Sequence, residues 1–253
     1  MYDRRRQSRP TVSVVIPTLN EELNLPFVLP RIGTWIDEVI IVDGRSTDNT
    51  PEVARELLPG VRIVHERRSG KGAALRAGFA ACTCDLIIML DADGSTDPRE
   101  IPLFVGALAA GAEFVKGTRF AQGAGTEDMW FLRRFGNRAL VRLVRLLFGG
   151  RFTDLCYGYI ALWRRVLDDL DLDSDGFEIE TQMNLRALKA GLKVVEVPSF
   201  ERNRINGSSN LRTIQDGWRV LMTILREWRR GDQTLRPALP EAAFVPNPQS
   251  TRL

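Results

Sequence analysis

Residues 85–94 constrain the fold of this chain more than any other segment. An apolar run, Leu86 to Leu90, ends abruptly at two carboxylates, Asp91 and Asp93, with a single alanine between them. Such a run is typical of a parallel strand that is buried on both faces of a sheet. Ligands of open α/β sheets bind beyond the carboxyl ends of the strands, and alternation along an extended chain turns both carboxylates to one side. The segment therefore predicts an α/β fold with a ligand site at the end of this strand.

Asp91 and Asp93 are candidate metal ligands. Two oxygen ligands on one side suit a hard divalent cation, Mg²⁺ or Mn²⁺, which takes further ligands from substrate phosphates. The alternative is structural: Asp91 caps a helix and Asp93 forms an Asp-Gly turn with Gly94. This short motif does not separate the two interpretations, and the loops that follow the other predicted strands decide between them.

Composition narrows the class of protein. The chain has 253 residues, 44% hydrophobic and 26% charged, which suits one large α/β domain or two small halves sharing a sheet. No apolar run approaches the roughly 20 residues needed to span a bilayer, and none is placed as a signal peptide, so we expect a cytoplasmic protein. Three cysteines are too few for a disulfide framework and lack the spacing of a zinc site. A net charge of +3 does not by itself indicate a polyanionic partner, and we expect no nucleic acid.

The first predicted strand, residues 12–17, ends at Pro17 and leads through a polar loop into a helix. We expect that helix to continue to about Ile32, with Asn20 or Thr18 as its cap. A strand followed by a helix N-terminus can bind the anionic part of a nucleotide. Glu21 and Glu22 in the first turn suit the helix dipole equally well, so this loop alone decides nothing.

Two further predicted strands end in polar loops at the same sheet edge. Residues 37–42 lead to Asp43-Gly44, where the carboxylate can bind a nucleoside base or ribose, or form an Asx turn. Residues 61–64 are followed by Gly70-Lys71-Gly72, a turn that permits close approach to a diphosphate, with Lys71 as a point charge. Together these loops offer base recognition, diphosphate contacts and metal ligands, and they favour a nucleotide and metal site.

The second half of the chain is rich in arginine. Residues 130–148 form a helical pattern with one basic stripe, and the last predicted helix, about 211–228, has an apolar face. A basic stripe is ordinarily a solvated helix face, and an apolar face ordinarily packs on the core. The alternative is that both helices lie in a membrane surface. The helix that opens after residue 176 turns Glu178 or Glu180 toward the site, or uses them only to satisfy its dipole.

At this point the sequence resembles the family 2 glycosyltransferases of the GT-A fold, and more narrowly the polyprenyl-phosphate sugar synthases of the dolichol-phosphate mannose synthase group. The matching segments lie between residue 12 and about 230: 15–21, 42–50, 70–72, 91–93, 116–119, 154–159 and 200–211. The resemblance implies a Rossmann-like, mostly parallel sheet with helices on both faces, followed by C-terminal amphipathic helices.

The predicted domains follow from this resemblance. Residues 11–230 would form the GT-A domain, with a nucleotide-sugar-binding half at 11–120 and an acceptor-binding half at 121–230. Residues 1–10 and 231–253 are polar or proline-rich, and we expect both ends to be disordered.

The resemblance implies an inverting, metal-dependent transfer of a sugar from a UDP- or GDP-sugar to a polyprenyl phosphate. The metal would be Mg²⁺ or Mn²⁺ on Asp91 and Asp93. The residues implied for the nucleotide-sugar are Pro17, Asn20, Glu21, Asp43, Gly44, Gly70, Lys71, Asp91 and Ala92. Those implied for the acceptor phosphate are Arg119, Arg133, Arg134, Arg204 and Ser209. The candidate catalytic residues are Asp93, Lys71, Asp154 and Glu178.

The chemistry of the acceptor separates the main hypothesis from its alternative. A phosphate monoester, whose second pKa is about 6, is already largely ionised near neutral pH and needs arginines rather than a base. A hydroxyl acceptor on a polysaccharide or small molecule would need a carboxylate base, for which Asp154, Glu178 and Glu180 are candidates. A more remote alternative is a sugar-nucleotide-binding protein without catalysis, because Gly94-Ser95 replaces the Leu-Gln that usually follows the second aspartate in this family.

The same resemblance suggests how the chain reaches a lipid. We expect the two arginine-rich helices to contact the membrane surface, beside a small membrane-protein partner, so that the protein is peripheral at the inner face of the cell membrane. The sequence leaves a homo-oligomer open.

Overall fold

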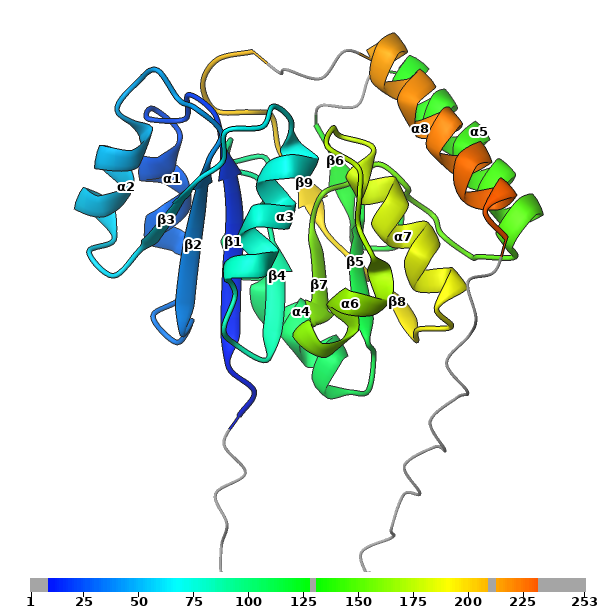
Figure 1. Ribbon diagram of the computed structural model, residues 1–253, viewed down its shortest axis with the longest axis horizontal. Coiled ribbons are helices and arrows are strands. Elements are labelled where there is room, and N and C mark those ends of the chain that lie inside the picture. Colours follow the sequence, from blue (N-terminus) through cyan, green and yellow to red (C-terminus); the bar gives the residue numbers. More distant parts are fainter. Residues whose placement is uncertain (1–8, 128–130, 209–212, 232–253) are drawn as a thin grey trace, which may run out of the picture.

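The computed structural model describes residues 9–127, 131–208 and 213–231 (Figure 1). Most of the two predicted disordered ends, and Ser209 among the predicted acceptor residues, therefore lie outside the described part of the chain.

A seven-stranded sheet forms the centre of the fold, with strand order β3-β2-β1-β4-β7-β5-β8. Its strands are β1 (Val12–Thr18), β2 (Glu38–Asp43), β3 (Arg62–His65), β4 (Leu86–Met89), β5 (Phe114–Thr118), β7 (Ile160–Trp163) and β8 (Val194–Pro198). Every neighbouring pair is parallel except the two made by β7, which runs antiparallel to β4 and β5. The prediction of a mostly parallel sheet is therefore confirmed. A second small sheet pairs β6 (Gly125–Thr126) with β9 (Phe200–Glu201).

The sheet is buried on both faces, and β4 at its centre is apolar and buried at every position. In β4, Ile88 packs into the core cluster on one face and Ile87 into the cluster on the other. The first cluster lies under α4 (Ile101–Ala109), which contributes Phe104. The second lies under α3 (Lys71–Ala81) and α7 (Ile179–Lys189), which contribute Phe79 and Met183. Helices cover both faces, as the near-continuous apolar strands predict.

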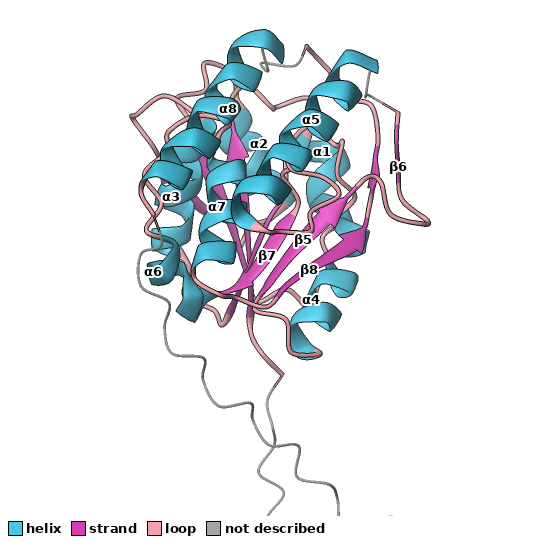
Figure 2. Cartoon of the chain, turned by 90° about the vertical axis from the view of Figure 1, so that its right-hand side faces the viewer, coloured by secondary structure: helices cyan, strands magenta, loops and turns pink. Residues whose placement is uncertain are grey.

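The helices are α1 (Leu25–Val28), α2 (Thr50–Leu57), α3 (Lys71–Ala81), α4 (Ile101–Ala109), α5 (Phe131–Phe148), α6 (Leu167–Leu170), α7 (Ile179–Lys189) and α8 (Thr213–Arg229), with 3₁₀ turns η1 (Leu29–Arg31), η2 (Pro98–Glu100) and η3 (Arg164–Val166). The long helices α5 and α8 lie side by side outside α7 (Figure 2). Val144, Leu185 and Ile224 form a third apolar cluster that joins these three helices. Within the described residues, no helix is both long and apolar enough to cross a membrane.

The first helix is shorter than predicted, and Asn20 does not cap it. The N-cap position belongs to Asn24, and α1 continues only as the 3₁₀ turn η1. Asn20 has a positive φ of 58° and its side-chain oxygen accepts a hydrogen bond from the backbone N–H of Thr47 at 2.8 Å. The loop after β1 is thus fastened to the loop after β2, and the helix begins only where those contacts end.

Candidate active site

Asp91 and Asp93, at the end of β4, both line a cavity of about 240 Å³. Ala92 between them is buried in the core, so the two carboxylates share one side as expected, although residues 92 and 93 form a turn beyond the end of β4. The turn that we proposed as the alternative is also present, because Asp93 accepts a hydrogen bond from the backbone N–H of Ser95 at 3.0 Å. The other part of that alternative is wrong, because Asp91 caps no helix: the next helical turn, η2, begins at Pro98 and has Asp97 as its N-cap. The turn at Asp93 does not exclude metal binding.

Lys71 lies between two carboxylates on the cavity floor. Its Nζ is 2.5 Å from Asp91 Oδ1 and 2.6 Å from Glu180 Oε1. Burial alone would lower the pKa of Lys71, but the two carboxylates raise it above its ordinary value. Burial and the nearby charge of Asp93 raise the pKa of Asp91 to about 6, against the opposing effect of Lys71. The floor therefore holds two acidic groups around one ammonium.

Gly158 makes room for this group of three. A Cβ at this position would lie 2.6 Å from Glu180 Oε1 and 2.8 Å from Lys71 Nζ. The buried Lys116 holds the preceding residue in place by donating from Nζ to the backbone oxygen of Tyr157 at 3.0 Å. A side chain at residue 158 would therefore displace the charged groups without touching the backbone.

The Gly70–Gly72 turn is close-packed against the protein itself. The backbone oxygen of Asp175 accepts from the N–H of Gly72 at 2.7 Å and of Ala73 at 3.1 Å. A Cβ on Gly72 would lie 2.3 Å from Ser174 O, and Gly70 has a φ of 117°. The close approach that we predicted for a diphosphate is made here by the 174–175 backbone, so the glycines have a structural explanation. Lys71 remains the group of this turn that faces the cavity.

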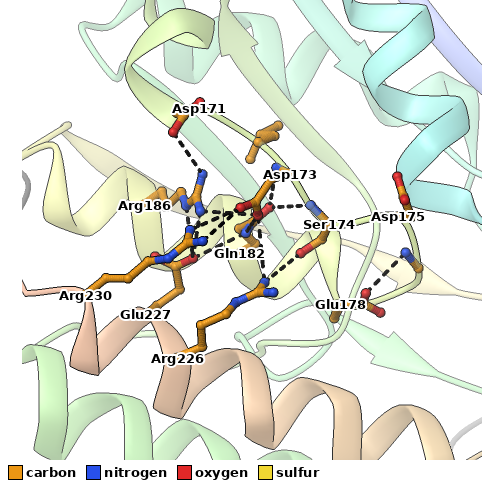
Figure 3. A network of polar contacts seen from close by, with 12 residues as sticks. Asp171, Asp173, Ser174, Asp175, Glu178, Gln182, Arg186, Arg226, Glu227 and Arg230 are labelled. Carbon is orange, nitrogen blue, oxygen red and sulfur yellow. Dashed lines mark hydrogen bonds and ion pairs between the residues drawn. The ribbon is translucent and has the colours of Figure 1, made fainter.

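A polar network fixes the 171–175 segment to α7 and α8 (Figure 3). Arg186 of α7 donates to Glu227 Oε1 of α8 at 2.9 Å and to Asp173 Oδ1 at 3.3 Å. The side-chain amide of Gln182 donates to the same Asp173 oxygen at 2.5 Å. Arg230, at the end of α8, also contacts Asp173 at 3.1 Å. The network thus connects α8 to the segment that caps α3 above Lys71.

This network predicts a pH-dependent stability. Burial raises the pKa of Glu227, but hydrogen bonds from Arg186 and Gln182 bring it below its usual 4.5. The stabilisation is therefore complete above the unfolded-state pKa and is lost as pH falls through the lower, folded-state pKa. We expect Glu227→Gln to lower the free energy of unfolding at pH 7 by about 1.5–3 kcal/mol. In urea titrations the difference from wild type should shrink below pH 4.5. A difference that is constant with pH would contradict this explanation.

Five of the residues predicted to bind the nucleotide-sugar, Pro17, Asn20, Glu21, Asp43 and Gly44, lie around the ends of β1 and β2. Pro17 is the penultimate residue of β1, and Gly44 donates its N–H to the backbone oxygen of Thr18 at 2.9 Å. Asp43 is buried and accepts from the N–H of Ser46 at 3.1 Å, while its other oxygen is 3.2 Å from His65 Nδ1. Burial raises the pKa of Asp43, but these hydrogen bonds bring it below its ordinary value.

Arg204 reaches from the loop after β9 to two predicted ligand-binding carboxylates. It donates to both oxygens of Glu21 at 2.7 Å and lies 3.4 Å from Asp93 Oδ2. Burial is the main reason why the pKa of Glu21 is raised, and Arg204 opposes it. Arg204 therefore connects Glu21, a predicted nucleotide-binding residue, to Asp93, a predicted metal ligand. The sequence alone did not reveal this connection.

The other predicted phosphate-binding arginines are placed differently. Arg119 is buried, and its guanidinium is bound to Asp154 at 2.7 Å, to Glu201 at 3.0 Å and to the backbone oxygen of Cys156 at 3.0 Å. Arg133 lines the cavity and donates to Thr213 Oγ1 at 3.2 Å. Arg134 does not line it; its guanidinium lies 5.6 Å from the ring centroid of Phe120. Arg119, Arg133 and Arg204 are thus brought to the cavity, and Arg134 is not.

The structure places only one of the three candidate bases, Asp154, Glu178 and Glu180, at the cavity. Asp154 is fully buried in its pair with Arg119, and Glu178 at the N-cap of α7 accepts from the N–H of Gly176 at 3.2 Å. Neither lines the cavity, whereas Glu180 does. This placement argues against Asp154 and Glu178 as bases, because neither carboxylate can reach a ligand in the cavity without leaving its present partner.

Sequence reasoning missed several residues around the site. His65 belongs to no motif of the sequence, although parallel pairing of β2 with β3 places it opposite Asp43. Glu201, Phe177, Asn137 and Thr181 all line the cavity. Helical spacing from Arg133 would have found Asn137, one turn further along the same face of α5. Glu201, Phe177 and Thr181 belong to no motif or spacing in the local sequence that could have indicated their position.

Comparison with known proteins shows the family. The profile described as "Glycosyl transferase family 2" matches residues 13–171, more than half of the chain. The chain belongs to glycosyl transferase family 2. Glycosyltransferase AglJ of Haloferax volcanii is 35% identical over 85% of this chain and 71% of its own length. The polyprenol monophosphomannose synthase of Mycolicibacterium smegmatis is 35% identical over 80% of this chain and 82% of its own length.

Solved structures agree with this family-2 assignment. Glucosyl-3-phosphoglycerate synthase from Mycobacterium tuberculosis, in complex with phosphoglyceric acid, has a TM-score of 0.71 and 25% identity, covering 87% of this chain and 80% of that one. A complex of the same enzyme with Mn²⁺, UDP and glucosyl-3-phosphoglycerate, at a TM-score of 0.68 and 24% identity, has the same fold. This family-2 chain is therefore a glycosyltransferase with the GT-A fold, and it resembles the polyprenyl-phosphate sugar synthases.

The donor set of this family-2 site suits a divalent cation that is completed by substrate. Among the described residues, no group of three His, Cys, Asp or Glu side chains could hold a metal by itself. Asp91 and Asp93 are two carboxylates on one cavity wall, and Mg²⁺ commonly uses one or two carboxylates plus substrate phosphates. The residues therefore fit the expected metal.

Proposed function

We propose that this glycosyltransferase moves a sugar from a nucleoside diphosphate sugar to a polyprenyl phosphate, with a divalent cation and inversion at the sugar carbon. The observation that carries the proposal is that one cavity is lined both by Asp91, Asp93 and Lys71 and by Arg133 and Arg204. The first group suits a departing diphosphate and the second suits an acceptor phosphate. The relative named polyprenol monophosphomannose synthase supports the same acceptor class.

The charges of the site suggest how the residues act. Asp91 and Asp93 would hold the cation, which when bound stabilises the negative charge of the leaving diphosphate. Lys71 and Arg204, now paired with Asp91 and Asp93, would then be released to donate to phosphate oxygens. Glu180 would keep Lys71 over the cavity floor during this exchange. The ion pairs thus pre-position the phosphate-binding cations.

The acceptor phosphate would need orientation more than deprotonation. Arg133 on α5 and Arg204 approach the cavity from different elements, and a phosphate monoester is itself the nucleophile. Since no carboxylate has to remove a proton from the acceptor, the reaction does not require Asp154 to leave its pair with Arg119. This distinguishes the main proposal from one that needs a free carboxylate.

A second candidate is transfer to a hydroxyl of a small phosphorylated acceptor. Two observations favour it: Glu180 lines the cavity, and the fold matches a synthase crystallised with phosphoglyceric acid. In that reaction Glu180 would act as the base and a cavity arginine would hold the acceptor's phosphate.

The deciding experiment is a transfer assay with Mn²⁺ or Mg²⁺, a panel of UDP- and GDP-sugars, and either citronellyl phosphate or 3-phosphoglycerate. We expect EDTA-sensitive product on the prenyl phosphate. Product on 3-phosphoglycerate alone, abolished by Glu180→Gln, would establish the second candidate instead. Metal-dependent binding of a donor without any product would indicate a binding protein.

We further propose that α5 and α8 contact an anionic bilayer. Leu146, Ile214 and Trp218 are 81%, 82% and 63% exposed, and arginines such as Arg138 and Arg142 lie on the same helix pair. Apolar side chains beside arginines suit the interface of an anionic membrane. The protein should float with vesicles that contain phosphatidylglycerol, and Trp218→Ser should weaken flotation. Equal recovery with neutral and anionic vesicles would contradict the electrostatic part.

Gly158→Ala provides a test of the cavity floor. The added methyl group would displace the flexible ends of Lys71 and Glu180, which lie 2.8 and 2.6 Å away, without touching the backbone. We expect sugar transfer to fall by about tenfold or more while the melting temperature changes by only a few degrees. Gly106→Ala on α4, where a Cβ would meet no atom of the described residues within 4 Å, is the matched control. A large loss of stability in Gly158→Ala would show that the glycine has a different role.

A further inference from the structure

The cavity has a second end, away from Lys71 and the two aspartates, between α5 and α8. There its wall is formed by Gly136, Leu140 and Gly217. The same three residues also line a groove on the outer side of the two helices, together with apolar Ile214 and Trp218. The charged cavity and the outer apolar groove therefore meet at Gly136 and Gly217.

Both glycines leave open space at the meeting point. A Cβ built on Gly136 or on Gly217 would find no atom within 4 Å among the described residues. Glycine within a helix costs about 1 kcal/mol relative to alanine. The packing of α5 against α8 does not require a small residue at either position, so the gap calls for another explanation.

Polarity changes in one direction along this path. The inner end carries Lys71, Asp91 and Asp93. Asn137, which follows Gly136 on α5, and Thr181 on α7 both line the cavity. Asn137 Nδ2 and Thr181 Oγ1 are buried and find no hydrogen-bond partner among the described residues. Buried polar atoms are normally paired, so these two are available to a polar group of a ligand.

The outer part of the path is mostly apolar. Leu140 and Val220 line it inside, and Ile214 and Trp218 line its outer margin. Its polar members include Asp216 on the inside and Gln215 and Arg219 in the groove. From the inner end outward, the lining of the path thus changes from charged to polar to mostly apolar. A molecule with an ionised head joined to a hydrocarbon chain has its chemical groups in the same order.

We infer that Gly136 and Gly217 form the opening through which the hydrocarbon chain of a phosphate-headed isoprenoid leaves the cavity. The phosphate stays inside with the arginines, and the chain passes between α5 and α8 to the outer groove. The inference rests on the proposed function and adds the two residues that set the preference for a long chain over a short one.

The test replaces both glycines by leucine, which favours a helix and fills the gap. With wild type, Gly136→Leu/Gly217→Leu and the control Gly106→Leu on α4, kcat/KM is measured for undecaprenyl phosphate and for citronellyl phosphate. We expect the long-to-short ratio to fall about tenfold in the double variant, as when two buried methylene groups return to water. The control should keep the wild-type ratio. An unchanged ratio in the folded double variant would overturn the inference.

Gly136→Ala and Gly217→Ala should lower the same ratio by a smaller factor, and they cover the case in which leucine unfolds the helix pair. A binding measurement separates the opening from the reaction. Calorimetry with monododecyl phosphate and with inorganic phosphate should show a chain-dependent gain in affinity that the double variant loses. If wild type transfers sugar to no prenyl phosphate yet shows this gain, the proposed function fails and the opening stands. If the gain is absent or does not depend on the glycines, the opening fails.

Discussion

Asp91→Asn is expected to lower the rate of sugar transfer by about a thousandfold, which corresponds to roughly 4 kcal/mol of lost transition-state stabilisation. Asparagine keeps the size of the side chain but loses the charge that a divalent cation requires. It also leaves Lys71 with Glu180 as its remaining carboxylate on the cavity floor. Initial rates at saturating Mn²⁺, together with Mn²⁺ affinity from calorimetry, provide the measurement.

Asp93→Asn should have a similar effect, and the double variant should be little worse than either single one, because residues that act as a unit are not additive. Asp85→Asn is the matched control. It lies just before the other end of β4, where its carboxylate accepts from Thr11 at 2.9 Å and an amide oxygen can do the same. Asp91→Asn with normal Mn²⁺ affinity and transfer would refute the assignment of the metal ligands.

Asp154→Ala is expected to destabilise the fold by about 3–5 kcal/mol, because it leaves the buried guanidinium of Arg119 without its main partner. Burial raises the pKa of Asp154, but Arg119 outweighs it and brings the pKa below its ordinary value. The pair is therefore charged throughout the neutral range. Urea denaturation followed by circular dichroism measures the loss.

Glu201→Ala is the natural comparison, since this carboxylate also pairs with Arg119 but is 14% exposed. We expect it to cost less than half as much, because solvent can partly replace the lost partner. If Asp154→Ala instead kept wild-type stability and only abolished transfer, the residue would be a catalytic base after all, contrary to its placement in the structure.

The sequence was sufficient for features that depend on local pattern. The apolar run of β4 predicted both the central strand and the common side of Asp91 and Asp93, since alternation is a property of any extended chain. The loops after β1, β2 and β3 were correctly expected at one edge of the sheet, because parallel strands bring their carboxyl ends together.

Partners that are distant in the chain could not be predicted. Lys71 and Glu180 are 109 residues apart, and Arg204 and Glu21 are 183 residues apart. No local period encodes such contacts. The glycines around Lys71 were interpreted as ligand-binding for the same reason: the 174–175 backbone that contacts them belongs to a distant segment. The short α1 was missed because contacts between two loops replaced the helical ones.

The antiparallel strand β7 has a consequence for how the protein is made on the ribosome. β5 has only β7 and β8 as neighbours in the sheet, so it must wait for residues 160–163 before it can pair. A nascent chain ending after β5 would also leave β4 as an open edge of apolar residues, a template for aggregation. The half that we predict to bind the nucleotide is thus complete in sequence long before it can be complete in space, and chains truncated near residue 120 should accumulate as insoluble protein.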